Sequence, residues 1–348
     1  MLAQHRALLA AGENSFAFWG RGRAPEADTE NQFCKASEVY LDALLTRVDG
    51  RAGFHSKTAT RRLLRMLDDI DPDVVHLHNL HGYYVNVEML FEWLARRDCS
   101  IEWTLHDCWA FTGHCAYFTY VRCDRWKTGC ENCPQKRSYP ASFFMDGSAG
   151  NYCLKCRLFT SISPERMELV TPSQWLKGLV EQSFLKGYPI VVRHNEIDRS
   201  QFKPTASDFR ARCGIGGRTM ILGVASPWTE RKGLSDFVRL SAELDIKKYA
   251  IVLVGLNEKQ IKKLPDSIIG IKKTESKREL AEIYTAADVF FNPTREDNYP
   301  TVNLEAEACG TPVVTYNTGG CGETIQLRDS KVVVDFIDAV MHLRKLNS

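Results

Sequence analysis

Two carboxylates flank the start of one predicted helix. Asp297 lies in a polar loop after the predicted strand 287–293, and Glu305 follows eight residues later, in the second turn of the predicted helix 301–309. A carboxylate can accept hydrogen bonds from two hydroxyl groups at once, so this pair suits recognition of a ribose or another sugar. The alternative is an ordinary strand-to-helix connection with both acids in solvent.

The first backbone amides of the same helix form a candidate anion site. Pro300 fits the start of a helix, because the N–H that proline lacks would have no partner there. The amides of Thr301 and Val302 then point out of the helix N-terminus, where the helix dipole favours an anion such as a diphosphate.

Basic and histidine side chains lie at or after the ends of other predicted strands. Arg231 and Lys232 lie in the loop after strand 219–226, at the strand end where α/β proteins bind ligands. The alternative for this loop is a solvated basic turn. His78 and His106 end two predicted strands of the first half, where a single histidine is more often structural.

Cysteines cluster in the first half: seven of the twelve fall between Cys108 and Cys156. A C-x-x-C spacing like that of residues 130 and 133 is typical of a zinc knuckle. A structural zinc would fold a long segment that we expect to lack its own core. Two sets complete four ligands: Cys115, Cys123, Cys130 and Cys133, or Cys130, Cys133, Cys153 and Cys156. The spacing favours the second set. Reduced thiols packed as small apolar groups are the third interpretation.

The chain must position these residues with regular elements, and both halves alternate helices with strands. This alternation predicts parallel sheets wrapped by helices. In the second half we expect strands at 219–226, 249–255, 287–293 and 311–317, and helices at 233–244, 277–286, 301–309 and 333–346. In the first half we expect a helix before Gly12, strands at 15–19, 73–78, 100–107 and 189–195, helices at 58–69 and 86–97, and a strand and helix within 169–180. Residues 108–160 interrupt the alternation as a Cys-rich insertion.

The composition is that of a globular protein in water, with 44% hydrophobic and 25% charged residues and a net charge of +2. This balance indicates no nucleic-acid partner. No apolar run approaches the roughly 20 residues that span a bilayer, and the first residues lack the apolar stretch of a signal peptide. We therefore expect a cytoplasmic location.

The segment 293–320 resembles the donor-binding signature of family 4 retaining glycosyltransferases, which have the GT-B fold. The matching positions are Asp297 (where the family usually has Glu), Glu305, Ala306, Gly310, Pro312 and Val313. The resemblance implies that Glu305 binds the ribose hydroxyls and that Asp297 contacts the donor sugar, with Glu296 as a substitute acid. It also implies that the Tyr299–Val302 backbone, which includes Thr301, cradles the diphosphate.

Other segments extend the resemblance. In the loop GVASPWTERKGL, Lys232 matches a lysine that contacts the donor phosphates, and Arg231 supplies a charge that the family carries where Ser226 stands. His106 matches a histidine that faces the donor sugar and the reacting centre, and we expect His78 on the acceptor side. Lys232, Asp297 and His106 are thus the expected catalytic residues.

A finer resemblance, to glycosyltransferases of colanic-acid and exopolysaccharide biosynthesis, rests on TLHDCWAFTGHC, Cys123, GCENCPQ and YPAS. It favours the zinc set with Cys115 and Cys123. GT-B enzymes use no metal in transfer, so the resemblance implies no catalytic cofactor and, at most, a structural zinc.

The expected fold is α/β and GT-B-like, with two Rossmann-like doubly wound domains. We place an acceptor-side domain at 1–195 and a donor-binding domain at 196–348. Because the chain opens within a helix, we expect the first domain to lack its initial, central strand, through truncation at the N-terminus, and to expose strand edges.

The expected function is transfer of a sugar from a nucleotide-sugar donor to a saccharide, lipid-linked acceptor, with retention, in surface polysaccharide biosynthesis. Such an acceptor implies peripheral association with the inner face of the membrane. The alternatives are a truncated, non-catalytic remnant and a nucleotide-sugar epimerase on the same fold.

Overall fold

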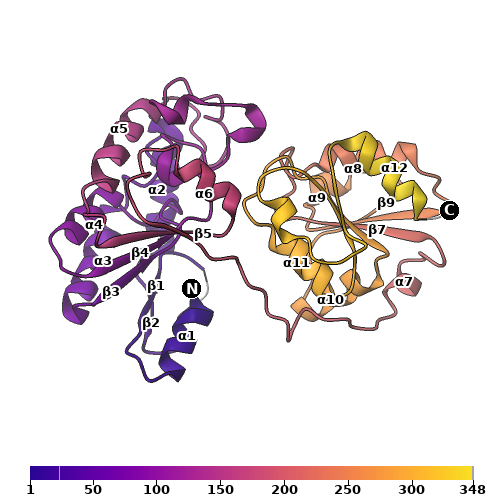
Figure 1. Ribbon diagram of the computed structural model, residues 1–348, viewed down its shortest axis with the longest axis horizontal. Helices are drawn as coiled ribbons and strands as arrows, with labels where there is room; N and C mark the ends of the chain where they lie inside the picture. Colours follow the sequence, from indigo (N-terminus) through magenta and orange to yellow (C-terminus); the bar gives the residue numbers. More distant parts are fainter. Residues whose placement is uncertain (23, 347–348) are drawn as a thin grey trace. The chain divides into compact units, whose positions relative to one another are not determined.

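The computed structural model describes residues 1–22 and 24–346. The chain divides into two compact units, which are described separately (Figure 1). The first comprises Met1–Pro172 and Leu176–Arg193, and the second Ser173–Trp175 and His194–Ser348. Both units are built on parallel sheets, which confirms the predicted α/β class.

The second unit contains a six-stranded parallel sheet in the order β12-β11-β10-β7-β8-β9. Its strands are apolar in nearly every position, as expected where both faces of a sheet are covered. They are β7 (Thr219–Val224), β8 (Tyr249–Val254), β9 (Ile268–Ile271), β10 (Val289–Asn292), β11 (Val313–Tyr316) and β12 (Lys331–Val333).

Alternate residues of these strands supply two cores. Ile221 and Leu253 pack with Phe237 of α8 on one face, whereas Leu222 and Val252 pack with Tyr284 of α10 on the other. Figure 1 shows α8 and α12 on one side of the sheet and α10 and α11 on the other. The helices are α7 (Phe209–Arg212), α8 (Leu234–Glu243), α9 (Glu258–Ile261), α10 (Lys277–Ala286), α11 (Thr301–Ala308) and α12 (Phe336–Lys345).

The first unit has two separate parallel sheets. In the part of the chain that the structure describes, strands β1 (Ala17–Trp19) and β2 (Glu30–Gln32) pair with each other and with no other strand, while the order β3-β4-β5-β6 forms the larger sheet. This division is what a doubly wound domain without a central strand would show. The larger sheet comprises β3 (Val74–Leu77), β4 (Ser100–Thr104), β5 (Met167–Thr171) and β6 (Ile190–Val192). The helices are α1 (Leu2–Ala10), α2 (Ala36–Asp49), α3 (Lys57–Ile70), α4 (Val87–Ala95), α5 (Ser148–Phe159) and α6 (Gln174–Val180).

The predicted insertion is shorter than expected, because its last part is the regular helix α5. Phe159 of α5 packs against Phe91 and Trp103, with ring centroids 4.4 and 4.9 Å apart, so α5 belongs to the main core of the unit. The irregular part contains three short 3₁₀ turns, at Trp109–Phe111, Thr119–Val121 and Arg125–Lys127.

The expectation that this irregular part lacks a core is wrong. Phe111, Phe118 and Trp126 are almost completely buried and contact one another, with ring centroids 4.9–6.2 Å apart. The ammonium group of Lys155, also fully buried, donates to the carbonyl oxygens of Trp109 and Thr112 at 2.8 and 3.0 Å. Aromatic packing and these hydrogen bonds therefore hold the segment.

Candidate functional site

The strand order of the second unit reverses between β7 and β10. From β7 the chain adds β8 and β9 on one side, and β10 to β12 follow on the other. Ligands of doubly wound sheets bind outside the carboxyl ends of the strands at such a reversal. The loops 225–233 and 293–300, which carry most of the predicted donor-site residues, follow these two adjacent strands.

An ion pair joins the two loops. Lys232 Nζ lies 2.5 Å from Asp297 Oδ2, and both side chains are mostly buried, with 22% and 13% exposed. Arg231 Nη1 lies 4.0 Å from the same oxygen and donates to the carbonyl oxygen of Glu296. The Glu296 side chain is fully buried, whereas Asp297 keeps some exposure. Lys232 is therefore a mostly buried, ion-paired cation, and the loop is not a solvated basic turn.

Two glycines allow a third loop to approach Asp297. A β-carbon on Gly319 would lie 1.9 Å from the carbonyl oxygen of Asp297, and one on Gly320 would lie 2.0 Å from that of Asn298. Gly319 also has φ +57°, a conformation that favours glycine. The amide of Gly320 donates to the Asp297 carbonyl oxygen at 3.0 Å. This loop, after β11, thus fixes the backbone on which Asp297 lies.

Glu305 lies on α11 and is half-buried. Its Oε2 accepts a hydrogen bond from the Tyr284 hydroxyl at 3.1 Å. Burial raises the pKa of Glu305 to about 7, although the hydrogen bond from Tyr284 opposes this rise. The carboxyl is therefore about half ionised near neutral pH and has capacity for further hydroxyl groups.

The N-terminus of α11 follows Pro300, which is the N-cap residue with extended backbone. Thr301 and Val302 occupy the first turn and are half-buried. Tyr299, just before the proline, stacks on the His194 ring with centroids 4.7 Å apart and planes 15° apart. Asn303 fixes the helix, because it bonds to both Asn292 and Thr324 through its side-chain amide.

In the first unit, the structure brings the two predicted histidines together. His78 Nδ1 and His106 Nε2 lie 3.0 Å apart, after the neighbouring strands β3 and β4. Burial lowers the pKa of His106, and burial with the adjacent His76 and His106 lowers the pKa of His78 to about 3. Both rings are therefore neutral at physiological pH, so one donates a proton to the other in a hydrogen bond.

The sequence analysis missed a second polar group nearby. His81 Nε2 lies 2.9 Å from Asp107 Oδ2, and His81 Nδ1 lies 3.2 Å from the Tyr139 hydroxyl. His81 comes shortly after His78, and Asp107 immediately follows His106. The polar residues after each predicted strand could have pointed to this second group. Tyr284 and His194 were also missed. Each lies far in the sequence from the site residue that it contacts, which is Glu305 for Tyr284 and Tyr299 for His194.

Three cysteines of the first predicted zinc set, Cys115, Cys130 and Cys133, lie near one another. The Cys115 thiol donates a hydrogen bond to the Cys133 sulfur, which raises the pKa of Cys115 and lowers that of Cys133. Cys130 lies near Cys133 and accepts from the Gly113 amide at 3.2 Å. Among residues 1–22 and 24–346, however, no three His, Cys, Asp or Glu side chains are arranged to hold a metal ion. The zinc site stays a prediction.

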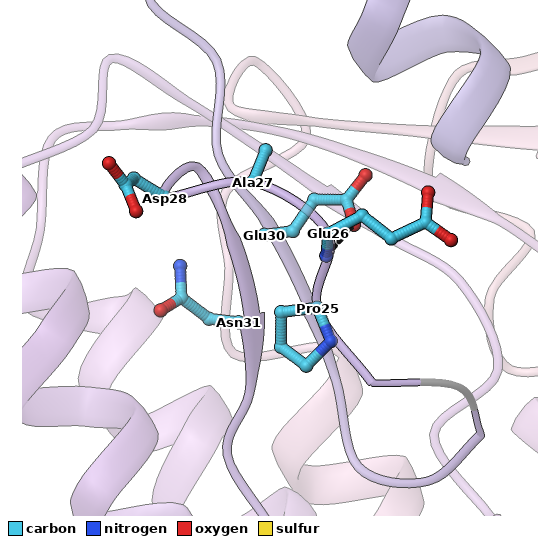
Figure 2. Close-up of a pocket in the computed structure, with 6 residues that line it drawn as sticks. All are labelled: Pro25, Glu26, Ala27, Asp28, Glu30 and Asn31. Atoms are coloured by element: carbon cyan, nitrogen blue, oxygen red, sulfur yellow. Dashed lines mark hydrogen bonds between the residues drawn. The ribbon is translucent and has the colours of Figure 1, made fainter.

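A pocket of about 440 Å³ lies on the first unit, at residues 25–31 (Figure 2). It contains none of the predicted site residues. Two of its acidic side chains are engaged locally, because the Glu30 carboxylate accepts from the Glu26 amide and lies 3.6 Å from Arg6, and the Glu26 carboxylate lies 3.2 Å from Arg6. We therefore assign it no role in the site.

Comparison with known proteins supports the resemblance on the carboxyl-terminal half of the chain. Residues 208–348 match the family model described as Glycosyl transferases group 1. The chain is 24% identical over 289 residues to the Escherichia coli (strain K12) protein WcaC, described as a colanic acid biosynthesis glycosyl transferase, covering 79% of this chain and 67% of WcaC. It is 31% identical over 142 residues to a D-inositol 3-phosphate glycosyltransferase of Corynebacterium jeikeium, covering 36% of this chain and only 34% of that protein.

Solved structures agree on the fold. Sucrose-phosphate synthase from Thermosynechococcus elongatus matches with a TM-score of 0.69 at 14% identity, covering 99% of this chain and 82% of the other. WaaG, a lipopolysaccharide glycosyltransferase, matches with a TM-score of 0.64 at 15% identity, covering 99% and 85%. Anabaena Alr3699/HepE, solved in complex with UDP, matches with a TM-score of 0.61 at 13% identity, covering 95% and 89%.

The predicted resemblance is thus confirmed at the level of the group and the fold. The chain has the GT-B architecture of these neighbours, and its carboxyl-terminal residues 208–348 match the glycosyl transferases group 1.

Proposed function

We propose that this glycosyltransferase transfers a sugar from a nucleoside-diphosphate sugar to a saccharide on a lipid carrier, with retention of the anomeric configuration. The product would belong to an exopolysaccharide or another surface polysaccharide. The similarity to WcaC supports this substrate class. The observation that carries the proposal is the convergence of Lys232 and Asp297 at the β7/β10 reversal of a group 1 domain.

Lys232 would stabilise the leaving diphosphate. Charge accumulates on the bridging oxygen as the bond to the sugar breaks, and a fixed cation lowers the energy of that state without reorganisation. The first amides of α11 would bind the same diphosphate from the helix N-terminus. In this proposal, these groups supply the positive charge, and transfer uses no catalytic metal.

Glu305 would bind the ribose of the donor. Its ionised form can accept hydrogen bonds from two hydroxyl groups, and Tyr284 already orients one oxygen. A donor hydroxyl would favour the ionised form, so binding would release a proton where the free carboxyl is still protonated.

Asp297, His106 and His78 would contact the sugars. One carboxylate oxygen of Asp297, Oδ1, accepts from the Asn298 amide, and the other, Oδ2, pairs with Lys232. A hydroxyl of the donor sugar would therefore donate to Oδ2 alongside Lys232. The neutral His106 and His78 rings can each both donate and accept, which suits hydroxyl groups. We assign His106 to the donor sugar and His78 to the acceptor.

A lipid-linked acceptor would place the enzyme at the inner face of the membrane. In the described part of the chain, no helix combines the length and the apolarity of a bilayer span. We propose that attachment to the membrane is peripheral.

The decisive experiment measures donor turnover. Purified protein would be incubated with UDP-, GDP- and dTDP-sugars, with and without a membrane lipid extract, and release of the nucleoside diphosphate would be followed. Release that depends on the extract and is lost in Lys232→Ala supports the proposal, and NMR of the product would check retention.

Two other outcomes would overturn it. Conversion of the donor sugar to its epimer, without nucleotide release, would identify an epimerase. Nucleotide binding without turnover of any donor would favour a non-catalytic remnant, which the divided sheet of the first unit makes the main alternative.

A further inference from the structure

Helix α2 of the first unit carries its apolar residues on the outside. Tyr40, Leu41, Leu44, Leu45 and Val48 are 40–77% exposed and recur at the spacing of a single helix face. The opposite face, which packs on the protein, contains Asp42, Ala43 and Thr46.

This arrangement is the reverse of an ordinary amphipathic helix. Helix α12 also exposes apolar residues, such as Ile337, but its inner face is apolar, with Ala339, Val340 and Leu343. In α2 the inner face is held by polar contacts instead: Asp42 accepts from Ser56 and from Thr46. The outer face is thus the more apolar one, and exposure of such a face to water is unfavourable.

A second segment extends this face. The amide of Phe143 donates to the Arg47 carbonyl oxygen at 2.8 Å, and that of Met145 donates to Val48 at 2.9 Å. These bonds lay residues 143–145 along the end of α2. Phe143, Phe144 and Met145 are 50%, 74% and 61% exposed. The eight residues Tyr40, Leu41, Leu44, Leu45, Val48, Phe143, Phe144 and Met145 form what we call the α2 face.

The exposed charges around the α2 face are mainly positive; the carboxylate of Asp146, which follows Met145, accepts from the amides of Cys133 and Ser148. Arg47 is exposed on α2, and the Lys136 ammonium donates to the Phe144 carbonyl oxygen at 3.2 Å, next to exposed Arg137. The acids of α2 are engaged elsewhere: Glu38 pairs with Arg62, Asp42 is buried, and Asp49 lies 3.1 Å from His55.

We propose that the α2 face docks the enzyme on an anionic lipid bilayer. Leucine, phenylalanine and tyrosine side chains would enter the boundary between headgroups and acyl chains, and Arg47, Lys136 and Arg137 would contact lipid phosphates. Helices with such a face lie in the plane of the membrane surface, and each nearby cation strengthens attraction to an anionic leaflet. The excess of positive charge beside the face favours this occupant over a second copy of the chain, which would bring like charges together.

The inference deepens the proposed function, because it would bring the enzyme to a lipid-linked acceptor, but its test does not depend on activity. The experiment is co-sedimentation of the whole protein with vesicles of phosphatidylcholine, with and without phosphatidylglycerol. The test variant is Leu44→Asp/Phe144→Asp. The matched control is Ile337→Asp, which places the same charge on an exposed apolar residue of α12 that is 66% exposed.

We expect binding to the anionic vesicles that decreases with salt. Leu44→Asp/Phe144→Asp should reduce the partition coefficient about tenfold or more, because it removes two inserted side chains. Arg47→Glu should weaken binding to anionic vesicles only, and Ile337→Asp should leave it unchanged. Circular dichroism and unchanged binding of UDP or GDP would show that the variants are folded.

Absence of binding to anionic vesicles, or an equal loss in Ile337→Asp, would overturn the inference. So would a wild-type dimer that Leu44→Asp/Phe144→Asp converts to a monomer, because the α2 face would then bind a second copy. Lack of sugar transfer with intact, face-dependent vesicle binding would count against the proposed function alone.

Discussion

Lys232 and Asp297, which lie 65 positions apart in the chain, form a close ion pair between two loops of the second unit. The carboxylate compensates the ammonium charge and orients the lysine. In the proposed mechanism a donor diphosphate would share this lysine with Asp297, so the pair would set both the position of the cation and the strength of its contact with phosphate.

Lys232→Ala should reduce kcat/KM for donor turnover by about 10²–10³-fold, the usual effect of removing one preorganised group that stabilises developing charge. Steady-state nucleotide release would measure it. Lys262→Ala, at an exposed position after α9, is the matched control. A Lys232→Ala enzyme with wild-type kinetics would remove this lysine from the mechanism.

Glu305→Ala should abolish transfer and weaken nucleotide binding by about 1–3 kcal/mol, through the loss of paired hydrogen bonds. Calorimetric titration with UDP and with GDP would measure it. Because the free carboxyl has a pKa of about 7, affinity should rise between pH 6 and pH 8 in the wild type. The same titrations with Glu305→Gln should show no such rise, and an equal rise in that variant would contradict the assignment.

The same carboxyl should influence stability with a defined sign. Its pKa rises from 4.5 to about 7 on folding, so the unfolded chain ionises first as the pH increases. Its contribution to the free energy of unfolding therefore falls between pH 4.5 and pH 7 and is constant above that range. The free energy of unfolding of the wild type, relative to that of Glu305→Gln, should therefore fall between pH 4.5 and pH 7 in denaturant titrations and stay constant above that range.

Gly319→Ala should displace the backbone of Asp297, because the new methyl group would overlap its carbonyl oxygen. We expect a loss of stability of about 1–3 kcal/mol, from the left-handed backbone and the overlap, together with loss of donor turnover. Gly322→Ala is the control, since its nearest neighbour would be 3.8 Å away. Similar melting temperatures and turnover rates for both variants would show that close approach of this loop is not required.

The two zinc hypotheses make different predictions. Cys130→Ser should abolish bound zinc in either case, whereas Cys123→Ser should do so only for the first set and Cys153→Ser only for the second. Metal analysis of protein purified without added zinc would decide. Because the segment has its own aromatic core, a metal-free but folded wild-type protein would leave reduced thiols as the interpretation.

The sequence was most informative where local pattern and ligand chemistry coincide. Strand β10, the loop with Asp297 and helix α11 were predictable, because an apolar run, a polar loop and a proline follow in order. The hydrogen-bond partners of the site residues could not be predicted in the same way. Nothing in the spacing links Glu305 to Tyr284 or His78 to His106, since both pairs arise from the packing of neighbouring elements.

Helix α2 and strands β2, β9 and β12 were missed for another physical reason. The strands are only three or four residues long, and β2 and β12 carry polar residues at exposed ends. In α2 the leucines face outward and an aspartate faces inward. Periodicity alone does not tell which face of a helix is buried, so a pattern that places polar groups against the core is not recognised.

The division of the first unit into two sheets has a consequence for its motions. Within residues 1–22 and 24–346, no ladder of hydrogen bonds couples β1 and β2 to β3, and a pair of three-residue strands is marginal by itself. We therefore expect the segment from α1 through β2 to open locally, so that its amides exchange with solvent while the sheet from β3 to β6 stays closed. Its rate of hydrogen exchange would report local opening rather than the global free energy of unfolding.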